Sequence, residues 1–219
     1  MMPIAIRQDP IRCLRRPVLA ALVAAAMVLA PGDADALNPA QEEALGAVNA
    51  YLNAITHLEG DFTQIAPDGE VSEGRFFIRR PGRARFDYAE PNRLLVIADG
   101  FWIGVVDRKL NTTDRYPIGS TPYWALLKEE VDLRTDARVL EIERDGGLIV
   151  VSIDDPSGEA AGELTLIFEE TGSDGTGGEL KLNQWLITDA QGLTTSVMVY
   201  NLVAGRPARN RLFTLHEFD

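Results

Sequence analysis

The chain has 219 residues, of which 46% are hydrophobic and 25% charged, which is typical of a globular protein with a sizeable core. Its formal net charge of −12 disfavours binding to nucleic acid or to an anionic membrane surface. The length suits one domain, or at most two small ones. Cys13 is the one cysteine, so no internal disulfide can form.

Residues 1–36 have the pattern of a secretory signal peptide. Arginines at positions 7, 12, 15 and 16 precede an apolar run of thirteen residues at 18–30, which is too short to span a bilayer. Ala34 and Ala36 then form a small-x-small cleavage pattern. We therefore expect cleavage after Ala36, export without Cys13, and one domain over residues 37–219.

An amphipathic helix is expected at the start of that domain. Asn38 is a good helix cap and Pro39 fits a first turn. The helix should end near His57, before Gly60. One apolar stripe recurs at helical spacing, formed by Leu45, Val48, Leu52 and Ile55.

Most of the remaining chain alternates between apolar and polar residues, as strands do. Six strands are predicted at residues 59–66, 72–80, 83–88, 93–99, 101–107 and 111–116. A short apolar helix is expected at residues 120–128, and six more strands at 138–144, 148–154, 162–169, 180–188, 193–199 and 211–218. An antiparallel sheet of this size must curl. We expect a mainly β fold, a curled and incomplete antiparallel barrel whose concave side the helices cover.

The stretch at residues 72–91 places an arginine on an apolar face. Two of the predicted strands meet there at Pro81-Gly82. Every second residue points to the same side of a strand, so Arg80 shares a face with Phe76, Ile78, Phe86 and Tyr88. Because an unpaired buried guanidinium is costly, Arg80 needs either a carboxylate at the sheet edge or carbonyls on a lid or ligand. The opposite face, with Arg75, Arg79, Arg83 and Arg85, is expected at the surface.

The sequence gives little support to an enzyme. No serine lies in a GxSxG turn, and no cysteine remains after residue 36. His57 and His216 have no second ligand at metal-binding spacing. We expect no catalytic residues, no metal and no cofactor, and a lipid-modifying enzyme that uses these histidines is the least favoured alternative.

Five motifs occur in the order of a known family: DFTQ at residues 61–64, IRRP at 78–81, RFDYAEP at 85–91, ADG at 98–100 and STPYWALL at 120–127. Together with the signal and the leading helix, they resemble the periplasmic lipoprotein carriers of the LolA type. The resemblance is clear over residues 45–127. After residue 131 only the strand pattern continues.

The resemblance implies a periplasmic, monomeric carrier with a hydrophobic cavity under a helical lid. Its cargo would be the acyl chains of lipoproteins, received from an inner-membrane lipoprotein-releasing transporter and passed to an outer-membrane acceptor. Arg80 matches the family arginine that holds the lid closed. The expected cavity residues are Leu45, Val48, Leu52, Ile55, Phe62, Phe76, Ile78, Phe86, Tyr88, Trp124 and Leu127. The alternative is an accessory or sensor protein of the same fold that binds a lipid or glycolipid.

Overall fold

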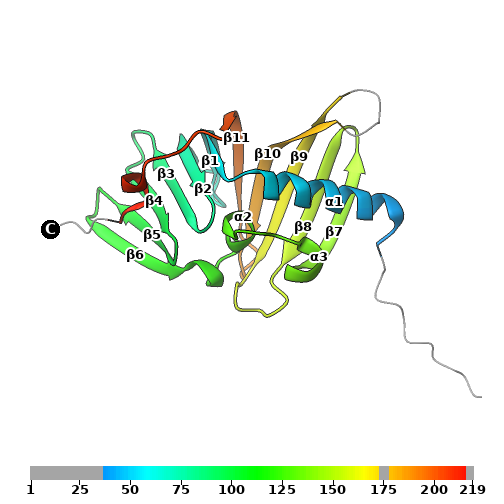
Figure 1. Ribbon diagram of the computed structural model, residues 1–219. Helices are drawn as coiled ribbons and strands as arrows, with labels where there is room; N and C mark the ends of the chain where they lie inside the picture. Colours follow the sequence, from blue (N-terminus) through cyan, green and yellow to red (C-terminus); the bar gives the residue numbers. More distant parts are fainter. Residues whose placement is uncertain (1–36, 173–177, 216–219) are drawn as a thin grey trace, which may run out of the picture. The chain divides into compact units, whose positions relative to one another are not determined.

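A computed structural model describes residues 37–172 and 178–215, so the expected signal peptide lies outside the described residues. Eleven antiparallel strands form one sheet in the order β6-β5-β4-β3-β2-β1-β11-β10-β9-β8-β7 (Figure 1). Because β6 and β7 are the two edges, the sheet does not close into a barrel. The expected mainly β, open antiparallel fold is confirmed.

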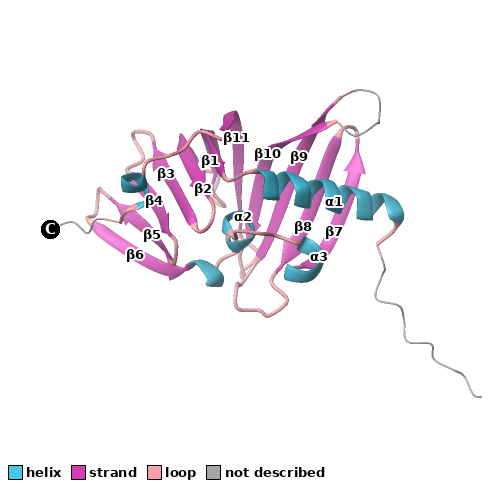
Figure 2. Cartoon of the chain, viewed as in Figure 1, coloured by secondary structure: helices cyan, strands magenta, loops and turns pink. Residues whose placement is uncertain are grey.

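The first half of the sheet is a meander that follows helix α1 (Pro39–Ala54) (Figure 2). Its strands are β1 (His57–Ile65), β2 (Val71–Arg79), β3 (Arg83–Tyr88), β4 (Leu94–Asp99), β5 (Trp102–Asp107) and β6 (Thr112–Pro117). The short helices η1 (Ile118–Ser120), α2 (Trp124–Leu127) and α3 (Leu133–Asp136) come next. The second half contains β7 (Arg138–Asp145), β8 (Leu148–Asp154), β9 (Glu163–Thr171), β10 (Glu179–Thr188), β11 (Thr194–Ala204) and the 3-10 helix η2 (Asn210–Phe213).

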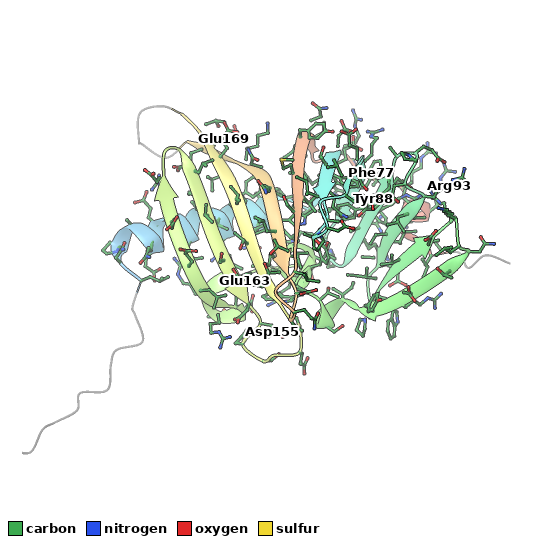
Figure 3. The ribbon with its side chains drawn as sticks, turned by 180° about the vertical axis from the view of Figure 1, so that it is seen from behind. Phe77, Tyr88, Arg93, Asp155, Glu163 and Glu169 are labelled. Atoms are coloured by element: carbon green, nitrogen blue, oxygen red, sulfur yellow. The ribbon has the colours of Figure 1, made fainter. Side chains whose placement is uncertain are left out.

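Helix α1 begins as its sequence predicts. The Asn38 side chain accepts hydrogen bonds from the main-chain nitrogens of Ala40 and Gln41, while Gln41 Oε1 accepts one from Asn38. The helix crosses β10, β9, β8 and β7, and seen from behind these strands lie in front of it (Figures 1 and 3). The ring of Tyr51 meets that of Phe168 on β9 at 5.2 Å, and its hydroxyl accepts a hydrogen bond from Leu182 on β10. Leu45, Val48 and Leu52 of the apolar stripe are buried in the same core.

The two-faced pattern of β2 and β3 is also confirmed. Phe76 lies opposite Phe86 and Ile78 opposite Ala84, and all four point into the core. Gly82, in the turn between these strands, has a φ of +71°, and a Cβ there would lie 2.9 Å from the Gly100 Cα. A glycine is therefore required at this turn for two independent reasons.

The prediction of a strand at residues 211–218 is wrong for the part that the structure describes. Residues 210–213 form η2, and residues 216–219 are outside the description. Phe213 is buried, and Leu215, two residues later, packs against Leu95, Ile97 and Val106 on the outer face, the side of the sheet opposite the core. The alternation of apolar and polar residues here therefore reflects packing against the outer face of the sheet and not pairing with a neighbouring strand.

Two arginines expected at the surface instead hold this C-terminal segment, residues 205–215. The Arg79 guanidinium donates to Ala208 O and Asn210 Oδ1 and stacks 4.9 Å from the centre of the Phe213 ring. Arg85 donates to Leu212 O at 3.1 Å. The expectation for these two residues was wrong, because the sequence does not show that another segment covers this face. Arg75 does lie at the surface.

Candidate functional site

A small apolar cavity of about 40 Å³ lies between α2 and the concave face of the sheet. Its walls come from β1 to β5, from β10 and β11, and from residues 123–127. Leu126 and Leu127 of α2 close it on the helical side. The volume exceeds the space that one water molecule needs but is far below that of a typical ligand pocket. An apolar ligand can enter only if the helices move.

The predicted cavity residues divide between this cavity and the core around it. Ile78, Phe86, Tyr88 and Leu127 line the cavity. Five others are buried in the contiguous core but do not line it: Leu45, Val48, Leu52, Phe62 and Phe76.

Two predicted cavity residues lie elsewhere. Ile55 borders a separate groove of about 670 Å³ between α1 and strands β1, β10 and β11. Trp124 points away from the cavity, toward Ile153 and Leu164 of β8 and β9. Ile55 lies beyond the last residue of α1, and Trp124 faces β8 and β9, so neither residue lines the cavity beneath α2.

Several lining residues were missed by the sequence reasoning. Gln64 lies two residues after the inward-facing Phe62 and is the last residue of the DFTQ motif, so strand alternation could have found it. Tyr123 lies just before α2, and the sequence does not indicate which side of the predicted helix it occupies. Trp185 of β10 is fully buried, and no motif marks it.

Arg80 connects the sheet to the C-terminal ends of two helices. Its Nε donates to Lys128 O at 2.5 Å, directly after α2, and its Nη1 donates to Leu52 O in the last turn of α1. Helix C-termini carry partial negative charge, which favours a cation there. The residue is 9% exposed, and this burial lowers the pKa of the guanidinium from its ordinary value, although arginine stays protonated in proteins. Of the two partners left open by the sequence, carbonyls rather than a carboxylate receive these hydrogen bonds.

A second set of contacts joins α1 to the segment after α2. Asn49 Oδ1 accepts from Leu133 N at 3.0 Å, and Asn53 Oδ1 accepts from Val131 N at 2.9 Å. The two amide nitrogens donate back, to Asp132 Oδ1 and Val131 O. We call α1, α2, α3 and the residues between α2 and α3 the lid. The Asn49 and Asn53 side chains thus hold α1 to the rest of the lid, and the sequence analysis does not identify them.

Changing both Asn49 and Asn53 to alanine is expected to lower the free energy of unfolding by about 2 to 6 kcal/mol. Each change leaves a buried main-chain N–H, of Leu133 or Val131, without its acceptor, at about 1 to 3 kcal/mol apiece. Urea unfolding followed by circular dichroism measures the effect. Gln191→Ala, in the exposed turn after β10, is the control and should stay within about 0.5 kcal/mol of the wild type. A double variant as stable as that control would contradict the assigned role.

The described part of the chain contains neither a metal-binding cluster nor a membrane-spanning helix. Within it, no cluster of three or more histidine, cysteine, aspartate or glutamate side chains could hold a metal. In the same residues, no helix is both long and apolar enough to cross a membrane. The His57 Nδ1 lies 3.2 Å from the neighbouring Thr56 hydroxyl, and His216 lies outside the description.

Fold and site together define an open half-barrel with an apolar interior beneath helices. Residues 53–216 match the family described as "Outer membrane lipoprotein carrier protein LolA", and the chain belongs to this family. The expected family resemblance is therefore confirmed.

Two proteins that carry this family's name are similar to the chain in sequence. An outer-membrane lipoprotein carrier protein of Methylococcus capsulatus is 28% identical over 175 residues, covering 76% of this chain and 80% of its own. One of Halorhodospira halophila is 33% identical over 144 residues, covering 58% and 66%. Among solved structures, a LolA superfamily protein of Nitrosomonas europaea aligns with a TM-score of 0.44 at 10% identity, covering 80% of this chain and 97% of that one.

Proposed function

We propose that this protein is a periplasmic carrier that takes the acyl chains of lipoproteins between its sheet and its lid. It would move lipoproteins from the inner to the outer membrane; its relatives are named outer-membrane lipoprotein carrier proteins. One observation carries the proposal beyond family membership. The buried guanidinium of Arg80 donates hydrogen bonds both to Leu52 O in the last turn of α1 and to Lys128 O directly after α2. Such a contact suits a lid that must open and close again.

The energetics of a carrier explain why the empty state needs its own stabilisation. Each methylene that leaves water contributes about 0.8 kcal/mol, so long acyl chains would bind too tightly to be handed on. Ligand entry would have to break the bonds from Arg80 to Leu52 and Lys128. Their loss offsets part of the gain and keeps the net affinity moderate. An acceptor with a more hydrophobic site could then take the cargo without an energy source.

The partners and the location belong to the same proposal. Residues 1–36 would direct export, an inner-membrane lipoprotein-releasing transporter would load the carrier, and an outer-membrane acceptor would unload it. A monomer meets these needs, because one cavity lies within one chain. The net charge of −12 suits a protein that approaches anionic membranes without binding them directly.

Mass spectrometry of material that co-purifies with the protein from envelope extracts tests this function. We expect acylated lipoproteins on the wild type and a several-fold lower yield on Ala84→Leu, whose larger side chain would fill the cavity. Ala89→Leu, at an exposed position just after β3, is the matched control. Thermal unfolding would show that both variants fold. Recovery of proteins without acyl chains, or equal yields from both variants, would refute the proposal.

A further inference from the structure

One corner of the apolar cavity is polar. Gln64, Tyr88, Tyr123 and Trp185 all line it. The Tyr88 hydroxyl donates to Gln64 Oε1 at 2.7 Å, so this pair is satisfied within the protein. The Trp185 indole Nε1, by contrast, is buried and meets no acceptor at hydrogen-bonding geometry. Among the described residues, only Arg80 Nη2 shares this condition.

The unpaired indole is held firmly in place. Trp185 lies in the middle of β10, opposite Leu166 of β9 and Val197 of β11, and is fully buried. Its ring meets Phe76 at 6.3 Å and Phe86 at 6.1 Å, both edge to face. Packing alone does not require a polar atom here, and a buried donor without an acceptor destabilises the fold. The indole interacts with the nearby Tyr123 hydroxyl, but no acceptor stands at hydrogen-bonding geometry in the closed protein, so the donor remains available to an acceptor that enters the cavity.

The side chains at this polar corner favour a ligand group that accepts a hydrogen bond and carries no charge. An indole nitrogen can only donate. Burial raises the pKa of Tyr123 to about 12, although the neighbouring Trp185 indole opposes this rise, so the Tyr123 hydroxyl keeps its proton. Burial also raises the pKa of Tyr88 above its ordinary value. None of the four side chains carries a charge at neutral pH, and a carboxylate would be costly to bury among them.

We propose that Trp185 Nε1 binds the carbonyl oxygen that links an acyl chain to its headgroup. This inference rests on the proposed function and adds to it. The hydrocarbon would supply most of the affinity, whereas the carbonyl would set how deep the chain sits. A carrier with this corner distinguishes acyl chains from plain hydrocarbon.

The test compares two probes that differ only in the carbonyls, 1,2-dihexadecanoylglycerol and its diether analogue 1,2-di-O-hexadecylglycerol. The wild type is expected to bind the diester about two- to tenfold more tightly, the range of one hydrogen bond. Trp185→Phe should lose this preference and bind the diether as the wild type does. Trp102→Phe, on the outer face of the exposed end of β5, is the matched control and should keep the preference.

A second readout does not depend on the variant. In the wild type labelled with ¹⁵N-tryptophan, the Trp185 indole proton should shift downfield with the diester and not with the diether. An unchanged indole signal, or a Trp185→Phe protein that still prefers the diester, would overturn the assignment while leaving the carrier function standing. Failure of the wild type to bind either probe would overturn both.

Discussion

Replacing Arg80 with leucine is expected to leave the carrier loaded and slow to release its cargo. Leucine suits the apolar face but cannot donate to Leu52 O and Lys128 O, so the closed lid loses both bonds. Hydrogen bonds from a charged donor contribute about 1.5 to 3 kcal/mol, or roughly 10- to 100-fold in affinity. The substitution therefore destabilises the closed, empty protein but not the loaded one. Transfer of a bound lipoprotein to an outer-membrane acceptor, followed over time, measures the effect.

Two further variants sharpen this test. Arg80→Lys keeps the charge but replaces the planar fork with a point donor, so it should fall between leucine and the wild type. Arg93→Leu removes an arginine from the exposed turn between β3 and β4, where it pairs with Glu90, and should transfer cargo normally. If Arg80→Leu transferred its cargo at the wild-type rate, the guanidinium would stabilise the fold without controlling the lid.

Phe62→Ala is expected to cause the largest loss of stability of any single substitution proposed as a test, about 3 to 5 kcal/mol. Phe62 is 0% exposed, and its ring packs edge to face against Phe86 at 5.5 Å and Tyr88 at 5.0 Å. Gly74 leaves the space that the ring occupies, since a Cβ there would lie 2.7 Å from it. The truncation therefore opens a cavity that neighbouring side chains cannot fill.

Urea unfolding provides the measurement, with the slope of the transition as a check on two-state behaviour. Phe101→Ala is the matched control, because that ring is 82% exposed in the turn before β5 and its loss should cost less than about 0.5 kcal/mol. If the two phenylalanine variants were equally stable, Phe62 would not be part of the core that supports the cavity.

The local features of the fold could be predicted from the sequence because each is determined by neighbours in the chain. Strand alternation correctly placed Phe76, Ile78 and Arg80 on one face, and the Asn38 cap correctly placed the start of α1. Alternation around Phe213 has the same appearance, yet that residue packs over the outer face. Alternation records burial on one side of a segment and does not record which partner buries it.

The site was harder to predict, because its important contacts join distant parts of the chain. The Asn49 and Asn53 amides bind main-chain groups about eighty residues away. Polar residues on a helix otherwise suggest a solvated face, so nothing local marks them. Trp185 likewise reads as one more apolar residue in a strand. Only the three-dimensional structure shows that Trp185 borders a cavity and that its indole nitrogen meets no acceptor at hydrogen-bonding geometry.

The pairing of β1 with β11 joins the beginning of the domain to its end. Residues 57–65 complete their place in the sheet only beside residues 194–204, and α1 packs against strands that begin at residue 138. Helix α1 and the edge of β1 that pairs with β11 are thus synthesised first but find their partners last, although β1 can pair early with β2. Until then the apolar side of α1 is open to water and to other chains. Such long-range contacts slow folding, and the apolar surface that stays exposed in the meantime is prone to aggregate.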